Sequence, residues 1–274
     1  MVRLGAGRQR VLLTTDAVVA GVHGDLDLIG PADFGWKALT AAVSDIAAMG
    51  GTPRHAVVSV GAPPGSPLEE LAEGLAEAAR AWACPVVGGD LSEAAQLFVA
   101  VAVTGTLAGD RPAVLRSGAR PGDALFVTGP LGASAAGLRV LRGGQPGGQD
   151  LVAAHRRPSA RLAEGRVARE AGARAMLDLS DGLGLDLHRL ARASQVGVRV
   201  DRVPAAAGAT EEEALGGGED YELLIAAPDD GRLERAFSAA GLRPPLRIGT
   251  CTADPTERRL GSQALPEAGY GHRL

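Results

Sequence analysis

Five aspartates in apolar surroundings are the residues of this sequence whose chemistry is most distinctive: Asp16, Asp45, Asp90, Asp178 and Asp181. Most of their neighbours are Val, Leu, Ile, Ala and Gly, so we expect these carboxylates to be half buried. A buried carboxylate is costly unless it is neutralised, paired or bound to a metal. Pairing with lysine is hardly available, because Lys37 is the only lysine in the chain. Converging carboxylates therefore predict divalent cations, and Mg²⁺ usually binds together with substrate phosphates.

The run Asp178-Leu179-Ser180-Asp181-Gly182 passes from a predicted strand into a predicted helix. The free N–H groups at the start of a helix favour an anion. Two carboxylates repel a neighbouring anion unless a cation lies between them, so the run predicts a phosphate that is bridged to the carboxylates by a metal ion. The alternative is that Ser180 or Asp181 is a simple N-cap, which would explain one of the two aspartates.

Two further motifs suggest ligand contact through backbone or carboxylate. Asp45 lies inside a predicted helix, where Asp is a poor helix former and has no end to cap. Gly88-Gly89-Asp90 follows a predicted strand, and its glycines would let the backbone approach a ligand. The alternative for this motif is a tight turn with an exposed Asp. Gly129-Pro130-Leu131-Gly132 has a similar, weaker potential to cradle phosphate oxygens.

A second group of residues suggests substrate contact. Gly216–Gly218 precede three acids, Glu219, Asp220 and Glu222, just before a predicted strand. This pattern predicts a substrate-contact loop, with solvated surface charges as the alternative. Arg116 could reach a phosphate in a cleft between domains, although an arginine in a linker is usually solvent-facing. His23, in a glycine-flanked loop, carries little weight alone.

Two apparent matches to known nucleotide-binding motifs are incomplete. Asp33-Phe34-Gly35 spells the magnesium-binding tripeptide of protein kinases, but no His-Arg-Asp loop or glycine-rich strand accompanies it. Residues Gly30 to Lys37 resemble a P-loop, but Trp36 separates Gly35 from the lysine.

Bulk properties narrow the class of protein. A chain of 274 residues suggests two domains. Its net charge is −4 and it has no basic runs, so the sequence does not predict the positively charged surface that binds nucleic acid. The two cysteines, Cys84 and Cys251, fit a reducing cytosol. No signal peptide or membrane-spanning apolar stretch is apparent, so we expect a cytoplasmic protein.

Strand and helix patterns alternate in both halves, which predicts an α/β (α+β) protein of two domains, 1–111 and 112–274, joined by a linker at Arg111–Asp123. The predicted strands are Val11–Thr15, Ala56–Val60, Val86–Val87, Leu97–Thr104, Ala124–Thr128, a short strand ending at Leu179, Gly197–Val200 and Tyr221–Ala227. The predicted helices are Pro31–Met49, Leu68–Trp82, Ala133–Leu141, Ala160–Ala171, Leu183–Ser194 and Gly231–Ala240. Gly143–Gly148 is predicted to be a flexible loop.

Taken together, the motifs closely resemble the thiamine-monophosphate kinase family of the aminoimidazole ribonucleotide synthetase-like superfamily. The matching segments follow the family's order over nearly the whole chain: Thr14-Thr15-Asp16, Gly21-Val22-His23, Gly35-Trp36-Lys37-Ala38, Ser44-Asp45-Ile46-Ala47-Ala48-Met49-Gly50, Val87-Gly88-Gly89-Asp90, Arg116 with Pro121-Gly122-Asp123, Asp178-Leu179-Ser180-Asp181-Gly182-Leu183 and Gly217-Gly218-Glu219-Asp220-Tyr221-Glu222-Leu223. The run from Ser44 to Gly50 and the run from Gly217 to Leu223 are specific, whereas Gly-Gly-Asp alone is not.

The resemblance implies the superfamily's two-domain fold, with a mixed sheet in the N-terminal domain. It also implies ATP-dependent, Mg²⁺-assisted phosphorylation of thiamine monophosphate to thiamine diphosphate in a homodimer. The implied metal ligands are Thr15, Asp16, Asp45, Asp90, Asp178 and Asp181, of which Asp16, Asp45, Asp90 and Asp181 are the implied catalytic residues. The implied ATP contacts are Gly89, Asp90, Arg116 and Ser180. The implied substrate contacts are His23, Glu219 and the aromatic Tyr270.

The sequence departs from the family pattern in two places. The family carries a Gly-Asp-Asp-Ala-Ala segment before the first strand, whereas this sequence begins at Met1-Val2-Arg3-Leu4. We therefore expect either a start placed too late or a true loss, and weakened or absent activity of the chain as written. Val19-Ala20-Gly21-Val22-His23-Gly24 lacks the family's acid and aromatic residue. Two alternatives stay open: a superfamily member with another acceptor, and a non-catalytic protein that binds nucleotide or thiamine phosphate.

Overall fold

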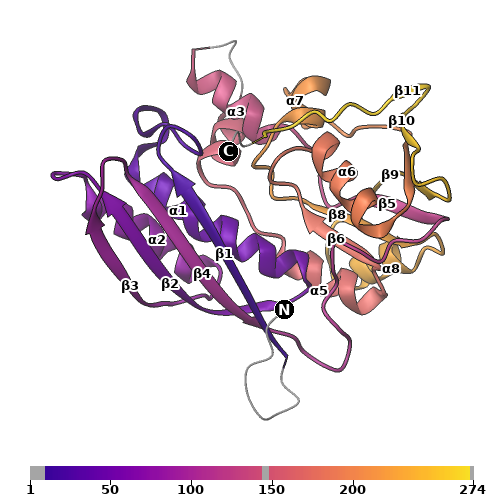
Figure 1. Cartoon of the computed structure of the whole chain (residues 1–274), viewed down its shortest axis with the longest axis horizontal. Helices are drawn as coiled ribbons and strands as arrows, with labels where there is room; N and C mark the ends of the chain where they lie inside the picture. Colours follow the sequence, from indigo (N-terminus) through magenta and orange to yellow (C-terminus); the bar gives the residue numbers. More distant parts are fainter. Residues whose placement is uncertain (1–9, 144–147, 272–274) are drawn as a thin grey trace.

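Two β-sheets organise the residues that the computed structural model describes, 10–143 and 148–271. The first sheet has the order β1-β4-β2-β3, with strands β1 (Val11–Val19), β2 (Thr52–Ala62), β3 (Val86–Glu93) and β4 (Phe98–Thr106). Only the β2–β3 pair is parallel within this sheet. Figure 1 shows helices α1 (Leu26–Ala48) and α2 (Leu68–Ala81) against one face, which leaves the other face open.

The alternation of β4 shows how this half-covered sheet arises from the sequence. Val99, Val101 and Val103 are buried, whereas the intervening Ala100 and Ala102 are partly exposed. Successive side chains of a strand point to opposite faces, so the valines pack under the helices. The open face is not strongly polar, because it exposes Leu13 (45%) and Val57 (47%).

Helix α1 begins one turn earlier than the predicted Pro31. The Asp25 side chain accepts a hydrogen bond from the Asp27 N–H (3.1 Å) and caps this first turn. Gly30 then interrupts the helix with φ of +73°, a conformation that glycine adopts without a Cβ clash. Pro31 restarts the helix, which it can do because the first turn of a helix does not need its missing N–H.

The second sheet has seven strands in the order β11-β10-β7-β9-β5-β8-β6. Its strands are β5 (Asp123–Val127), β6 (Ala175–Asp178), β7 (Gly197–Val200), β8 (Leu223–Pro228), β9 (Leu246–Thr252), β10 (Arg258–Leu260) and β11 (Gln263–Ala264). Its helices are α3 (Ala133–Leu141), α4 (Gln149–Arg156), α5 (Leu162–Ala171), α6 (Leu183–Ser194), α7 (Glu211–Gly216) and α8 (Arg232–Ala239).

Both faces of the second sheet are covered around β5. Leu125 and Val127 pack into a core with α6 and α7, whereas Ala124 and Phe126 pack into a core with α5 and α8. A strand that is buried on both faces reads as a continuous apolar run, which is why the sequence marked β5 so clearly.

Prediction and structure agree on most elements. Helices Ala133–Leu141 and Leu183–Ser194 and strand Gly197–Val200 match residue for residue. Helices α4 and α7 and strands β9, β10 and β11 were not predicted. Gly88-Gly89-Asp90 does not follow the predicted strand Val86–Val87 but continues it inside β3, so the alternative of a tight turn is wrong. The predicted loop at Gly143–Gly148 falls largely on residues 144–147, outside the described residues.

The predicted strand at Tyr221 begins two residues later, at Leu223. The cause is the backbone of Tyr221, whose φ of +51° is incompatible with a strand. The segment 107–122, between β4 and β5, has no helix or strand and only an isolated bridge between Leu115 and Ala175, as expected of a linker.

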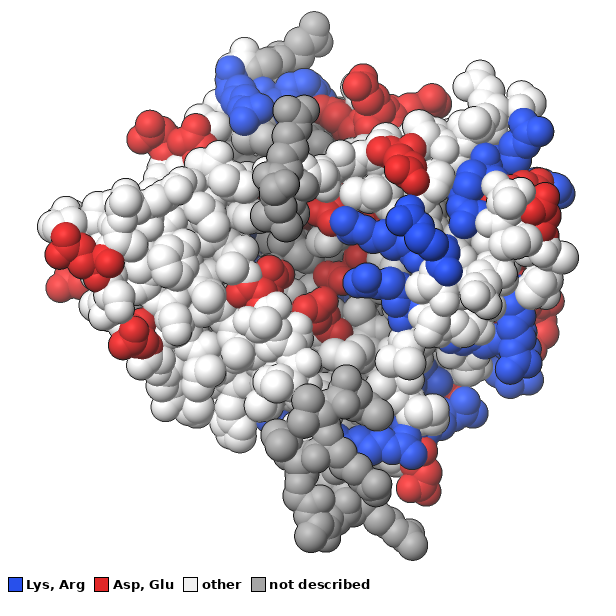
Figure 2. Space-filling view, viewed as in Figure 1, with Lys and Arg blue, Asp and Glu red and all other residues white. Residues whose placement is uncertain are grey.

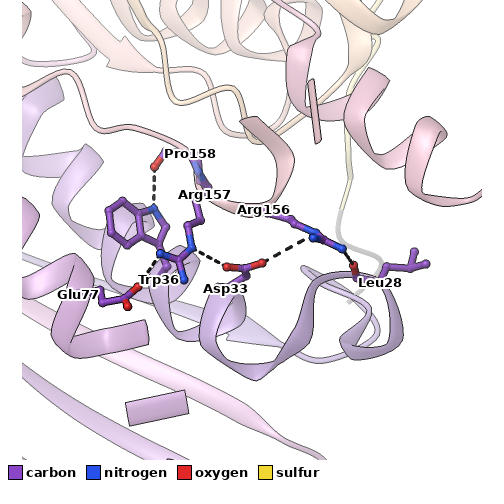
Figure 3. A network of polar contacts seen from close by, with 7 residues as sticks. All are labelled: Leu28, Asp33, Trp36, Glu77, Arg156, Arg157 and Pro158. Carbon is purple, nitrogen blue, oxygen red and sulfur yellow. Dashed lines mark hydrogen bonds and ion pairs between the residues drawn. The ribbon is translucent and has the colours of Figure 1, made fainter. Parts of the chain in front are cut away.

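A polar network joins the two halves of the chain at the end of α4 (Figure 3). Arg157 binds Asp33 (2.6 Å) and Glu77 (2.5 Å), and its guanidinium lies 5.3 Å from the centre of the Trp36 ring. The Trp36 indole N–H donates to the Pro158 carbonyl (2.9 Å). We call these five residues the Arg157 clamp. They give Asp33 a structural role instead of the nucleotide role that its tripeptide suggested.

Helix α1 also reaches into the second half of the chain. Ala47 and Ala48, at its C-terminal end, pack in the same core as Phe126 and Phe237. The end of α1 therefore lies beside the second sheet. Over residues 10–143 and 148–271, no helix is long and apolar enough to cross a membrane.

Candidate active site

A cleft of about 320 Å³ lies where β1, the end of α1, the linker and β6 meet. Four polar residues line it: Thr14, Asp45, Arg116 and Asp178. Figure 2 shows the same side of the molecule as Figure 1. Acidic side chains gather in its middle, where the two domains meet, and basic side chains lie beside them on the C-terminal domain. The cleft therefore brings together residues that are up to 164 positions apart in the sequence (14 and 178).

Asp45 projects from the last turn of α1 toward β1. Its Oδ2 accepts a hydrogen bond from the Thr14 hydroxyl. Burial raises the pKa of Asp45, while the Thr14 hydrogen bond and the positive charge of Arg116 oppose that rise. The prediction that Asp45 lies within a helix is confirmed, and Arg116 does reach the cleft between the domains.

Asp178 ends β6 and faces the same cavity. The Ser44 hydroxyl donates to its Oδ2 (2.6 Å). Burial, followed by the negative charge of Asp45, raises the pKa of Asp178 to about 7. The two carboxylates therefore destabilise each other's charged form, and a cation between them would relieve that repulsion.

This donor set fits Mg²⁺. Within residues 10–143 and 148–271, no group of three or more His, Cys, Asp or Glu side chains is arranged to hold a metal ion. Mg²⁺ does not need such a group, because proteins usually bind it through one or two carboxylates, with waters and substrate phosphates as the other ligands. Asp45 and Asp178 supply that number.

Asp181 lies in the same run as Asp178 but has its own cation. It forms an ion pair with Arg189, which also contacts Asp186 (2.8 Å). Burial raises the pKa of Asp186 to about 6, although Arg189 opposes the rise. The N-cap of α6 is Gly182, so the alternative that Ser180 or Asp181 caps this helix is wrong.

Asp16 lies two residues after Thr14 in β1, so both side chains are on the face that α1 covers. Its Oδ1 accepts from the Ala17 N–H (2.7 Å). Burial raises the pKa of Tyr221 well above its usual value, and the charges of Glu219, Asp16, Asp178 and Asp181 add to that rise. Thr15 points to the opposite face and is exposed, whereas the side chain of Thr14 contacts Asp45.

Asp90 and its neighbour Gly89, both predicted site residues, lie apart from the cleft within this chain. Asp90 is the one with a side chain to place. It lies on β3, the outer strand of the sheet, and its Oδ2 accepts from Ser92 (3.0 Å). The register runs from Asp16 through Val101 and Val58 to Gly89, which makes three strand spacings, or about 14 Å. Asp90 follows Gly89, so its side chain points to the open face, opposite to Asp16.

The segment 217–222, which we call the acid loop, runs beside Leu179 and Ser180. The Glu219 N–H donates to the Ser180 carbonyl (2.8 Å), and the Tyr221 N–H donates to the Leu179 carbonyl (3.0 Å). Gly218 is required at this crossing, because a Cβ there would lie 2.6 Å from the Ser180 oxygen.

Each acid of this loop has an internal partner. Glu219 binds Lys37 (2.7 Å), and Glu222 binds Arg161 through two hydrogen bonds (2.6 and 3.0 Å). Asp220 accepts from the backbone N–H groups of Gly132 (2.6 Å) and Ser134 (3.2 Å). The alternative of solvated surface charges is therefore wrong.

Asp220 also corrects the prediction of a phosphate cradle at Gly129–Gly132. The N–H groups at the start of α3 would have bound the phosphate, but the carboxylate of Asp220 occupies them. Burial raises the pKa of Asp220 to about 7 in spite of these donors.

Comparison with known proteins identifies the family. Residues 1–107 match the N-terminal domain and residues 120–261 the C-terminal domain of AIR synthase related proteins. The thiamine-monophosphate kinase of Bacillus subtilis is 36% identical, over 95% of this chain and 87% of its own length. The Halobacterium salinarum enzyme is 40% identical, over 87% and 83%. The chain belongs to the thiamine-monophosphate kinase family.

Solved structures of the thiamine-monophosphate kinase family have the same fold. The structure described as AaThiL complexed with AMPPCP and TMP has a TM-score of 0.86 and 30% identity, covering 98% of this chain and 89% of that one. The thiamine-monophosphate kinase of Stenotrophomonas maltophilia has a TM-score of 0.83 and 29% identity, covering 95% and 88%. The predicted family and fold class are confirmed.

The substrate contacts that the thiamine-monophosphate kinase resemblance implies lie on three segments. Glu219 is in the acid loop. Tyr270 is 47% exposed, and its N–H donates to the Asp181 carbonyl (2.9 Å), so the C-terminal segment lies against the Asp178–Asp181 run. His23 is in the loop after β1, where its Nδ1 accepts from the Val19 N–H (3.1 Å).

Three residues around this candidate site were not predicted as site residues. Thr14 and Ser44 donate to Asp45 and Asp178, and Lys37 binds Glu219. Two of these residues left a signal in the sequence. The alternation of β1 places Thr14 on the face of Asp16, and a lone lysine in the apolar stripe of a helix needs a buried acid as its partner.

Proposed function

We propose that this chain transfers the γ-phosphoryl group of ATP to the phosphate of thiamine monophosphate in the cleft between its domains. The supporting observation is the pair of carboxylates, Asp45 and Asp178, whose pKa values are both raised in a shared cavity. Perturbed carboxylates in a cleft are typical of functional sites. The kinase relatives support ATP and thiamine monophosphate as its substrates.

The chemistry suits such a site. The acceptor is a phosphate oxygen, which is already ionised near neutral pH, so no strong general base is needed. Catalysis instead requires two anions to be aligned and their charge neutralised. Asp45 and Asp178 would hold Mg²⁺, which supplies that neutralisation when bound.

The chain's own side chains would orient the reactants around this point. The guanidinium of Arg116, which is exposed at the cleft, provides a positive charge for a phosphate of ATP. Thr14 and Ser44 fix the orientation of the two carboxylates by donating to one oxygen of each. The two carboxylates, oriented in this way, would face a cation in the cleft. We place Ser180, Asp16 and Asp181 around the same phosphates.

The thiamine end would lie toward the acid loop and the C-terminal segment. The Glu219 Oε1 atom is buried and has no hydrogen-bond partner among the described residues. A buried acceptor without a partner is costly, and an amino group of a ligand would satisfy it. The exposed ring of Tyr270 offers an aromatic surface. His23 is the third contact that the family resemblance implies.

We also propose a cytoplasmic homodimer, which brings Gly89 and Asp90 into the ATP site. The open face of the first sheet carries Leu13 and Val57, which are 45% and 47% exposed. Exposed apolar side chains on an uncovered sheet suit burial against a second copy of the same face. Asp90 points to this open face, so a partner subunit is the natural place for its contacts.

A steady-state assay with ATP, Mg²⁺ and thiamine monophosphate tests the proposal, with ADP release and thiamine diphosphate both measured. We expect turnover that requires Mg²⁺ and falls when thiamine replaces its monophosphate. Turnover on other phosphorylated acceptors alone would favour the different-acceptor alternative. Binding of thiamine monophosphate without ADP release would favour the non-catalytic one. The rate also tests the expectation of weakened activity.

A further inference from the structure

The buried environment of Lys37 is the starting point. Lys37 is fully buried in α1, and its ammonium group donates to Glu219 Oε2 at 2.7 Å. Lysine is seldom fully buried unless its charge is paired. The two residues are 182 positions apart and belong to different domains. This ion pair therefore joins the helix that carries Asp45 to the acid loop.

The neighbouring His155 does not supply the positive charge that pairs with Glu219. His155, from α4, lies with its Nδ1 3.9 Å from the same Glu219 oxygen and 3.1 Å from the Ser134 hydroxyl. Burial, followed by the positive charge of Lys37, lowers the pKa of His155 to about 3. His155 is thus neutral, and Lys37 supplies the positive charge beside Glu219.

The unusual backbone conformation of Glu219 indicates that its contacts hold it in place. Its φ is +64°, in the left-handed region that non-glycine residues rarely adopt. A residue persists there only when its surroundings hold it. The Ser180 carbonyl holds its N–H, and Lys37 holds its side chain. The same side chain presents the unpartnered Oε1 atom.

We propose that Lys37 is a positioning residue for thiamine monophosphate, which acts by fixing the carboxylate of Glu219. This inference rests on the proposed function, since it takes Glu219 as a substrate contact. Lys37 does not touch the substrate itself, because its ammonium is buried behind that carboxylate. A compact ammonium on a flexible stem suits this position better than the planar fork of arginine.

A double-mutant cycle on the full chain tests the proposal. We expect Lys37→Met to raise the KM for thiamine monophosphate by about tenfold or more and to change the KM for ATP by less than about twofold. Glu219→Gln should have a similar effect, and the double variant should be no worse than Glu219→Gln alone, because both changes remove one interaction. Arg199→Met, which breaks a more exposed 2.7 Å ion pair between β7 and Glu257, is the control for the loss of an ion pair elsewhere in the chain.

Additive effects in the cycle, or an unchanged KM in Lys37→Met, would overturn the inference. Lys37→Gln serves as a second variant if Lys37→Met does not fold, because glutamine can still donate to Glu219. A smaller rise in KM for Lys37→Gln than for Lys37→Met would support positioning through that hydrogen bond.

A measurement that does not need turnover separates this inference from the proposed function. Because the chain has one lysine, ¹⁵N labelling of lysine at Nζ gives a single ammonium signal. We expect slow proton exchange for this signal, a shift on addition of thiamine monophosphate, and a different position in Glu219→Gln. A rapidly exchanging signal whose position changes neither on addition of thiamine monophosphate nor in Glu219→Gln would refute the inference. A wild-type protein without turnover that shows the expected signals would refute the proposed function alone.

Discussion

The cleft and the outer edge of the first sheet carry similar acidic motifs in very different surroundings. In the cleft, Asp45 and Asp178 are partly buried, each accepts a hydrogen bond from a hydroxyl, and the pKa of each is raised. At the edge, Gly88, Gly89 and Asp90 are exposed along with the rest of β3. The resemblance implied a ligand site at both places, but only the cleft is enclosed by this single chain.

The difference has a physical reason. The cleft is assembled by elements from both halves of the chain, so intramolecular packing decides its geometry. Strand β3 pairs on one side only, with β2, and its apolar Val87 and Leu91 are 61% and 62% exposed. Edge strands usually need protection from solvent and from other chains. An exposed edge with apolar side chains suits a contact with another subunit.

Substitution in the cleft should have the largest effect. We expect Asp45→Asn and Asp178→Asn each to lower kcat/KM by about a thousandfold, because each removes a charge that balances the cation beside the transferred phosphoryl group. Asp110→Asn, on an exposed loop, is the matched control and should stay within about twofold. The measurement is a steady-state assay at saturating Mg²⁺. Near-normal activity of both variants would place the chemistry outside the cleft.

Substitution at the edge should have a smaller effect that depends on the partner subunit. We expect Asp90→Asn to lower kcat/KM by about a hundredfold, as the loss of one contact to ATP or its metal would. If each site combines Asp45 of one subunit with Asp90 of the other, mixing inactive Asp45→Asn and Asp90→Asn proteins should restore activity.

After subunit exchange, half of the dimers are mixed and one of their two sites is intact, so about a quarter of wild-type activity should return. The comparison is the activity of each variant alone at the same total concentration. No recovery, with exchange verified by mass, would mean that Asp90 serves the site of its own subunit.

Sequence patterns predicted the elements that bury one continuous stripe. The stripe of α1 and the apolar run of β5 are examples, because burial against a sheet imposes the pattern directly. Short elements without such a stripe, such as α7 with its three glutamates, were missed because the Thr210–Glu213 capping box and tertiary contacts define them.

The sequence was enough to predict which types of residue form the site, but not which residues pair with one another. The aspartates were found because carboxylates among apolar residues are unusual, and Asp45 and Asp178 do share a cavity. The pairings of Lys37 with Glu219 and of Arg189 with Asp181 were not predicted, since they depend on contacts between elements that sequence spacing does not reveal. Asp90 shows the same limit, because its surroundings depend on how the strands are ordered.

The stability of the Mg²⁺-free protein should fall as pH rises. The pKa values of Asp178, Asp186 and Asp220 are raised to about 7, about 6 and about 7, mainly by burial. A carboxyl whose pKa is higher in the folded state binds its proton more tightly there, so its stabilising contribution is present at low pH and is lost as pH rises through the folded value. We therefore expect Tm to decrease between pH 5.5 and pH 8.

Mg²⁺ should reverse part of that decrease, because it replaces the proton at the cleft. Differential scanning calorimetry across this pH range, with and without Mg²⁺, measures both effects. Asp178→Asn should abolish the response to Mg²⁺, whereas Asp220→Asn should keep it, because the Asp220 carboxylate accepts from the backbone N–H groups of Gly132 and Ser134 and does not line the cleft. A Mg²⁺ response that survives in Asp178→Asn would move the cation away from the cleft.

The Arg157 clamp should have the smallest effect on activity, although it also joins the two halves of the chain. Trp36→Phe removes the hydrogen bond to Pro158 but keeps an aromatic ring under Arg157. We expect a loss of about 1 kcal/mol in the free energy of unfolding and a change in kcat/KM of less than about threefold. Lys37 is the next residue in α1, so this variant also tests whether the Lys37–Glu219 contact depends on its neighbour. A large rise in the KM for thiamine monophosphate would show that the clamp sets the position of Lys37, whereas urea unfolding with unchanged kinetics would confine the clamp to stability.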